Sequence, residues 1–243
     1  MKPYGGCTDS TGEPSFLMQR WSRCLAATAL ALLLLALPIG ATAESATSAP
    51  RPGVHVYLLR GVLNIFSLGL DEIAAKLQAQ GISTSVDNYL GWSAIADEAA
   101  AEYKSGRLRT IILVGHSSGA TILPDMVERL SQLGAPVTLA IGLDSVFHTS
   151  LSGRVGRYIN FYIANGSGTP VERTKQFRGD LENVDVEKIP GIGHITIDKN
   201  QIMQQRVISA IDAVVFRHPT ATSAKQAPGA TGAAGSTAPA ASK

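Results

Sequence analysis

Residues 110–120 read Thr-Ile-Ile-Leu-Val-Gly-His-Ser-Ser-Gly-Ala, and this stretch decides the fold. An aliphatic run ends in a Gly-x-Ser-x-Gly pattern, and apolar residues then recur at helical spacing. The pattern predicts a strand, a sharp turn and a helix, with Ser117 at the apex. Glycines are needed at Gly115 and Gly119 because a side chain there would collide with the neighbouring strand or helix. We therefore expect the turn to expose Ser117 above the sheet edge as a nucleophile.

The length and charge of the chain restrict the other classes of function. At 243 residues the chain has room for one α/β domain with tails. The formal net charge is +2 and the basic residues are scattered, so we expect no nucleic-acid partner. Both cysteines, Cys7 and Cys24, lie near the N-terminus. The remainder of the chain can therefore form no disulfide and no cysteine-based metal site.

The first 43 residues have the layout of a secretory signal peptide. Arg20 and Arg23 precede an apolar run at 25–37, and Ala-Thr-Ala follows at 41–43. The run is about thirteen residues long, whereas a membrane-spanning helix needs about twenty. We expect a secreted or periplasmic protein, and the alternative is an uncleaved N-terminal anchor as the only membrane contact. Residues 44–52 are then a linker.

The other end of the chain is compositionally biased. Residues 218–243 are rich in Ala, Thr, Ser, Gly and Pro and lack the large apolar residues that form a core. Such a composition predicts a disordered tail. The folded domain is accordingly expected at residues 53–217.

Short apolar segments alternate with helical patterns along this domain. We expect strands at 53–59, 82–89, 109–114, 136–143, 158–164 and 183–189, and helices at 70–80, 92–104, 118–133 and 197–215. Ser93 is the expected N-cap of the second helix. The alternation predicts an α/β three-layer sandwich with a mostly parallel sheet of about six strands and helices on both faces.

Residues 54–215 resemble the α/β-hydrolase family in a small form without a lid domain. The resemblance rests on a glycine-containing loop after the first strand, on the Gly115 to Gly119 turn, and on Gly191-Ile192-Gly193-His194 before the last helix. These three matches occur in the family's order. The resemblance implies the α/β-hydrolase fold, a catalytic serine at Ser117, and neither a metal nor an organic cofactor.

A serine nucleophile needs a base, and the chain contains five histidines. His55 lies inside the first strand, His116 lies within the turn, His148 is in a loop, and His218 borders the tail. His194 follows the last predicted strand and precedes the closing helix, the place of the base in the family that the chain resembles. We therefore predict His194 as the base.

The acid that orients His194 is harder to assign. Most of the resembled family carries it after the fifth strand, but residues 165–168 here read Asn-Gly-Ser-Gly. Some members carry it one strand earlier, which matches Asp144 at the carboxyl end of the fourth predicted strand. Asp144 is our candidate; Asp180 is the main alternative, and other carboxylates such as Asp198 stay open.

Oxyanion donors are expected on both sides of the nucleophile. The backbone N–H of Ser118 lies at the start of a helix, where free amides and the helix dipole favour negative charge. The second donor in the resembled family comes from the loop after the first strand. Here Arg60-Gly61 replaces the usual His-Gly pair, so the amide of Val62 is the candidate and that of Leu63 the alternative.

The substrate is constrained less closely. Residues 62–70 form an apolar loop, which either lines an acyl pocket or packs on the first helix. Residues 145–157 leave too little chain for a helical cap, so we expect an open site. The prediction is a serine hydrolase that cleaves small-molecule or lipid esters or thioesters through an acyl-enzyme. The alternative is a non-catalytic, hydrolase-like binding domain with this loop as its contact surface.

Overall fold

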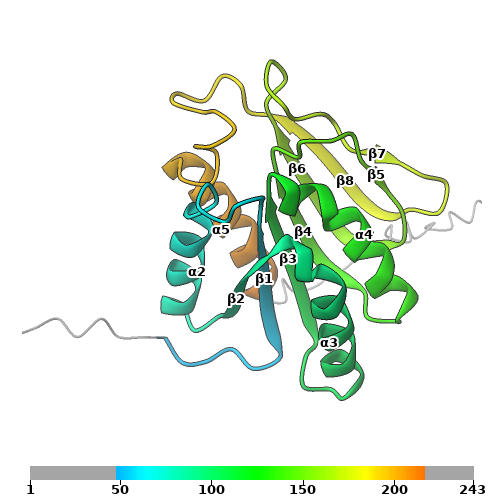
Figure 1. Cartoon of the computed structure of the whole chain (residues 1–243). Coiled ribbons are helices and arrows are strands. Elements are labelled where there is room, and N and C mark those ends of the chain that lie inside the picture. The colour runs from blue at the N-terminus through cyan, green and yellow to red at the C-terminus, as the bar shows by residue number, and fades with distance from the viewer. Residues whose placement is uncertain (1–47, 217–243) are drawn as a thin grey trace, which may run out of the picture. The chain divides into compact units, whose positions relative to one another are not determined.

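A six-stranded parallel sheet forms the centre of the computed structural model, which describes residues 48–216. The expected signal peptide or anchor and the predicted tail lie outside the described residues. The strands are β1 (Val54–Arg60), β2 (Ser83–Asn88), β3 (Thr110–His116), β4 (Val137–Leu143), β6 (Arg154–Tyr162) and β8 (Arg178–Asp185). Their order across the sheet is β2-β1-β3-β4-β6-β8, and every neighbouring pair is parallel (Figure 1).

Helices cover both faces of this sheet. They are α2 (Gly69–Ala79), α3 (Trp92–Lys104), α4 (Ser118–Gln132) and α5 (Gln201–Val215). Val56 and Leu58 of β1 pack in the core cluster that includes α2 and α5, whereas Tyr57 and Leu59 pack in the cluster that includes α3 and α4. Strands buried on both faces read as continuous apolar runs, which is the signal that β1, β3 and β4 carry. The expected three-layer α/β sandwich is confirmed.

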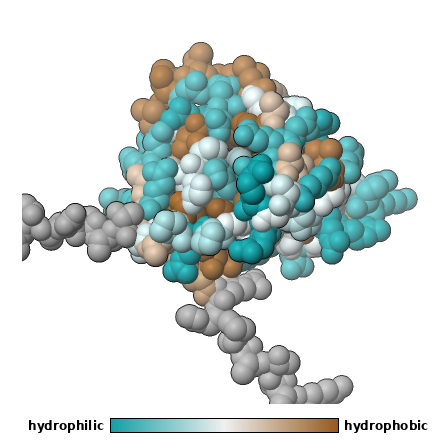
Figure 2. All heavy atoms as spheres, turned by 90° about the horizontal axis from the view of Figure 1, so that it is seen from below, coloured by the Kyte–Doolittle hydropathy of each residue, from teal (hydrophilic) through white to brown (hydrophobic). Residues whose placement is uncertain are grey.

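The surface seen from below in Figure 2 contrasts with this interior. Hydrophilic residues cover most of that face, and hydrophobic residues gather mainly along one margin of the view. The bulk of the apolar side chains is instead enclosed between the sheet and its two helical layers.

The connections from β4 to β6 and from β6 to β8 contain no helix, in agreement with the predicted helix ranges. Each carries a two-residue strand instead, β5 (Ser150–Leu151) and β7 (Glu172–Arg173), and these two pair in a separate small parallel sheet. Leu151 and Val171 are buried in the core on the α4 side. The two connections thereby cover this end of the sheet without adding a helix.

One predicted helix start and one predicted N-cap need correction. α5 begins at residue 201 and not at 197, because the Asn200 side chain accepts hydrogen bonds from the amides of Ile202 and Met203. Ser93 is not an N-cap, because α3 already begins at Trp92. A 3-10 turn (Tyr89–Gly91) precedes α3, and its own cap is Asn88.

The sheet order reverses direction between β1 and β3. β1 is followed by β2 on one side, whereas β3 and then β4 continue on the other side. α2 follows β1 on one face and α4 follows β3 on the opposite face (Figure 1). The loops after β1 and β3 both lie at the carboxyl edge beside this reversal, which is where open α/β sheets bind their ligands.

Candidate active site

The turn between β3 and α4 holds Ser117 in an unusual backbone conformation, with φ of 59° and ψ of −123°. A Cβ at Gly115 would lie 2.4 Å from the carbonyl oxygen of Gly119, and a Cβ at Gly119 would lie 2.0 Å from that of Leu59. Both separations are impossible, so the two positions must be glycine for the helix to pack this closely on the strands. The Ser117 N–H donates to the Leu143 carbonyl at 3.0 Å, which attaches the turn to β4.

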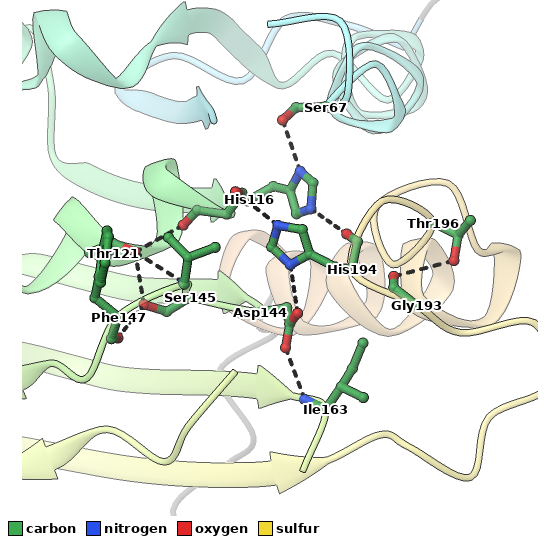
Figure 3. Close-up of polar contacts among 12 residues, drawn as sticks. Ser67, His116, Thr121, Asp144, Ser145, Phe147, Ile163, Gly193, His194 and Thr196 are labelled. Atoms are coloured by element: carbon green, nitrogen blue, oxygen red, sulfur yellow. Dashed lines mark hydrogen bonds and ion pairs between the residues drawn. The ribbon is translucent and has the colours of Figure 1, made fainter. Parts of the chain in front are cut away.

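The structure brings Ser117, His194 and Asp144 together. His194 Nε2 lies 3.0 Å from Ser117 Oγ, and His194 Nδ1 lies 2.7 Å from Asp144 Oδ2 (Figure 3). A carboxylate can only accept, so Nδ1 carries the proton and Nε2 is free to accept the Ser117 hydroxyl proton. His194 remains 27% exposed while Asp144 is fully buried.

Asp144 is held by the residues around it. Its N–H donates to the Phe161 carbonyl at 2.8 Å, and its Oδ1 accepts the N–H of Ile163 at 3.0 Å. A Cβ at Gly168 would come within 2.1 Å of Oδ1, so the segment 165–168 closes over the carboxylate. In most of the resembled family the acid lies in the loop after the fifth strand. Here that loop, after β6, packs against the carboxylate of Asp144, which follows β4.

The alternative acids do not contact His194. Asp180 lies within β8 and is exposed. Asp198 is buried, and its Oδ2 accepts the Gly69 N–H at 2.8 Å. Among the described carboxylates, Asp144 alone has a hydrogen bond to the His194 ring.

The loop after β1 lies directly against the Ser117 side chain. A Cβ at Gly61 would be 2.8 Å from Ser117 Cβ and 3.1 Å from Ser117 Oγ. The backbone amides of Val62 and Ser118, on either side of this contact, donate no hydrogen bond to any residue in the range 48–216. Within the described residues, neither candidate oxyanion donor is therefore occupied by a protein acceptor.

The loop after β1 carries exposed apolar side chains, and so do the loops that follow Asp144 and His194. We call these residues the apolar rim: Val62, Leu63, Ile65, Phe66, Leu68, Phe147 and Ile195. The exposed fractions of these side chains range from 42% at Phe66 to 67% at Leu63 and Phe147. Because the side chains of the loop are this exposed, the interpretation in which they pack on the first helix is wrong. Leu70 and Ile73 fill the α2 interface instead.

Thr121 is a supporting residue that the sequence did not indicate. Its Oγ1 lies 3.2 Å from the Ser117 carbonyl oxygen and 2.9 Å from Ser145 Oγ, and it also accepts the Val146 N–H at 3.2 Å (Figure 3). These contacts connect the nucleophile turn with the loop after Asp144. Its position four residues after Ser117 on α4 is the available signal, since such positions share a helix face.

The described residues contain no cluster of three or more His, Cys, Asp or Glu side chains that could hold a metal ion. Within the same part of the chain, the helices are too short or too polar to cross a bilayer.

Comparison with known proteins identified neither a matching family model nor a matching curated protein. Among solved structures, the chain is similar to two structures of acetylxylan esterase. One gives a TM-score of 0.41 at 13% identity, and the other, an iodinated complex, gives 0.42 at 14% identity. Each comparison covers 67% of this chain and 98% of the esterase chain.

Proposed function

We propose that this protein is a serine hydrolase that cleaves carboxylic esters or thioesters through an acyl-enzyme on Ser117. The observation that carries the proposal is the continuous line of contacts from Ser117 Oγ to His194 at 3.0 Å and from His194 to Asp144 at 2.7 Å. Nucleophile, base and orienting acid have the mutual geometry that acyl transfer requires.

The reaction follows from the positions of these atoms. Ser117 Oγ attacks the carbonyl carbon while its proton passes to His194 Nε2, and Asp144 stabilises the resulting imidazolium. The amides of Ser118 and Val62 bind the oxyanion of the tetrahedral intermediate. His194 then protonates the departing alcohol or thiol, which leaves the acyl group on Ser117. In the second half, His194 takes a proton from water and the water oxygen attacks the acyl carbon. The bond from the acyl carbon to Ser117 Oγ then breaks while His194 returns the proton to Oγ, and the carboxylic acid is released.

The apolar rim supports substrates with an apolar acyl or alcohol group. Val62 adjoins Gly61 beside the nucleophile, and Ile195 directly follows the base, so apolar surface borders the reacting atoms. Only ten residues separate β4 from β6 on this side, and they contain no helical cap. The residue pattern of the leader supports action outside the cytoplasm, in a secreted or periplasmic location.

A fluorophosphonate probe tests the proposal directly on the chain from residue 44 onward. We expect wild-type protein to be labelled and Ser117→Ala to be unlabelled, because the probe reacts only with an activated serine. Ser118→Ala is the matched control, since it changes the adjacent serine but retains the backbone amide. We expect this variant to be labelled.

A panel of p-nitrophenyl esters and acyl thioesters of increasing chain length then identifies the substrate class. We expect hydrolysis by the wild type and by Ser118→Ala, with kcat/KM rising as the acyl chain lengthens. Folded wild-type protein that neither labels nor hydrolyses any member would refute the proposal and favour the non-catalytic binding domain.

A further inference from the structure

His116 is a fully buried histidine directly before Ser117, and the mechanism above does not use it. Its ring lies between two segments that are far apart in the sequence. Nδ1 is 2.8 Å from Ser67 Oγ, in the connection between β1 and α2, and Nε2 is 2.8 Å from the backbone carbonyl oxygen of His194 (Figure 3). One side chain thus connects the loop that bears the oxyanion donor with the backbone of the base.

The protons of this network can be assigned from its acceptors. The His194 carbonyl can only accept, so His116 Nε2 must carry a proton. In the neutral ring Nδ1 then accepts the Ser67 hydroxyl proton, while Ser67 Oγ accepts the Gly61 N–H at 3.0 Å. The result is a directed chain from the Gly61 amide through Ser67 and His116 to the His194 carbonyl. Every donor in this buried chain has an acceptor, as a stable buried network requires.

The ring is held in its neutral form. Burial lowers the pKa of His116 below its usual value of 6.5, although the nearby Asp198 and Asp144 favour the charged form. A protonated ring would direct a second N–H at Ser67 Oγ and displace the Ser67 proton from its acceptor. The directed chain therefore belongs to the neutral state.

The two ends of this chain are the two groups that must face Ser117. Gly61 lies against the Ser117 side chain and directly precedes the Val62 amide, and His194 is the base. We propose that His116 is a positioning residue, which holds the Val62 amide and the His194 ring in register with Ser117. This inference rests on the proposed function, because it assigns a role within the same reaction.

The first test compares steady-state kinetics of Ser67→Ala, His116→Leu and the double variant. Ser67→Ala removes the link to the loop with a minimal change of volume, so it serves even where His116→Leu is poorly folded. We expect kcat to fall roughly 10- to 100-fold in each single variant, because displacements of about 1 Å have effects of this size. KM should change less than threefold, since the rim is untouched.

The double variant distinguishes positioning from independent packing losses. Both substitutions interrupt one chain, so we expect the double variant to be no slower than the slower single variant. His116→Gln should recover part of the lost kcat, because its amide can donate to the His194 carbonyl. Ser83→Ala is the matched control: it removes another serine–histidine contact, from Ser83 Oγ to His55 Nδ1 at 2.9 Å, on the β1–β2 pair. We expect it to retain wild-type kcat.

Three results would overturn the inference. Wild-type kcat in Ser67→Ala and His116→Leu would do so, as would rate losses that multiply in the double variant. The third is a nitrogen-15 NMR spectrum of the Ser117→Ala protein showing His116 protonated at Nδ1 and not at Nε2 at neutral pH. If the wild-type protein is labelled by fluorophosphonate while these results appear, the proposed hydrolase function is kept and only the positioning role of His116 is refuted. If the wild-type protein is not labelled, both proposals are refuted.

Discussion

Asp144 illustrates how much of the site depends on the placement of single residues. It is fully buried, has a left-handed backbone φ of 50°, and gives its two carboxylate oxygens to two different partners. Its Oδ1 is bound by the Ile163 amide, which leaves Oδ2 directed at His194. The carboxylate therefore fixes the tautomer of His194 as well as the orientation of its ring.

Asp144→Asn should lower kcat by orders of magnitude, up to about 10⁴-fold, because an amide can donate to Nδ1 and stabilise the wrong tautomer of His194. Asp180→Asn is the control, since Asp180 is exposed on β8. Steady-state kinetics with p-nitrophenyl esters measure both. Comparable losses in the two variants would contradict the assignment of Asp144.

Gly61→Ala should abolish most turnover without unfolding the domain, because the new Cβ would lie 2.8 Å from Ser117 Cβ. Gly91→Ala is the matched control: there the nearest atom to a new Cβ is 3.7 Å away, an ordinary contact. Kinetics together with circular dichroism of both variants provide the measurement. Gly61→Ala with wild-type kcat would show that the loop after β1 does not approach the nucleophile as described.

The neutral state of His116 predicts a pH dependence of stability. Its folded pKa lies below 6.5 because of burial. Between that pKa and 6.5 the unfolded chain binds a proton that the folded chain does not, so stability falls as the pH falls. The contribution of neutral His116 to the free energy of unfolding is fully present above pH 6.5, and it is lost as the pH drops through 6.5 towards the pKa of His116 in the folded protein.

Urea unfolding at pH values from 7.5 to 5 tests this dependence. The slope attributable to His116 has a maximum of about 1.4 kcal/mol per pH unit, and His116→Gln should lack it. The pKa of His55 is also lowered by burial, but His55 is present in both proteins, so its contribution to the slope cancels in the comparison. Equal slopes in the two proteins would contradict a neutral, buried His116.

Ser117 and His194 were accessible from the sequence because each lies in a short local pattern, and Asp144 because it directly follows a recognisable strand. The contacts that support them were not accessible. Ser67 is 49 positions from His116, and Gly168 reaches Asp144 only through the fold of the β6–β8 connection. Such contacts depend on the spatial arrangement of loops, for which the chain carries no periodic signal.

At the scale of elements, burial decides how well a segment can be located. β1, β3 and β4 are buried on both faces and begin and end within two residues of the predicted bounds. β8 lies at residues 178–185 and not at the predicted 183–189. The prediction was wrong because β8 is an edge strand whose side chains are mostly exposed, so it carries little apolar pattern. Its only apolar residues are Leu181 and Val184, so the pattern was dominated by the apolar residues that follow it.

The start of α5 offers a quantitative test of an element boundary. Asn200→Ala removes the side chain that accepts from two amides of the first turn, and we expect the free energy of unfolding to fall by about 1 kcal/mol. Ser93→Ala should leave it nearly unchanged, because Ser93 makes no cap hydrogen bond. Chemical denaturation measures both variants. A larger loss at Ser93 than at Asn200 would reverse the assignment of the two caps.

At the scale of the whole molecule, the core is completed by residues up to the end of α5. Met203, Val207 and Ile211 are fully buried against the sheet. The guanidinium of Arg51 lies over the ring of Phe216, with Arg51 Cζ 4.3 Å from the ring centroid. The last segment of the described chain is therefore part of the fold and contacts the residues that precede β1.

Removal of residues 219–243 should leave the thermal midpoint nearly unchanged, because the composition of this segment predicts no contribution to the core. Differential scanning calorimetry of the two chains, both starting at residue 44, measures the difference. A chain that ends at residue 200 is the control and should lose its cooperative transition, since it lacks α5. A fall of several degrees on removing the tail alone would show that it packs on the domain.

The parallel sheet has a consequence for how the protein acquires activity. The Ser117–His194 and Asp144–His194 contacts span 77 and 50 positions of the sequence, and no strand of the main sheet is joined to its neighbour by a hairpin. Such long-range pairings form slowly, since the entropy of closing large loops must be overcome first. The proposed hydrolase activity should thus return after helix formation during refolding, and its recovery is a specific measure of how many molecules have reached the native state.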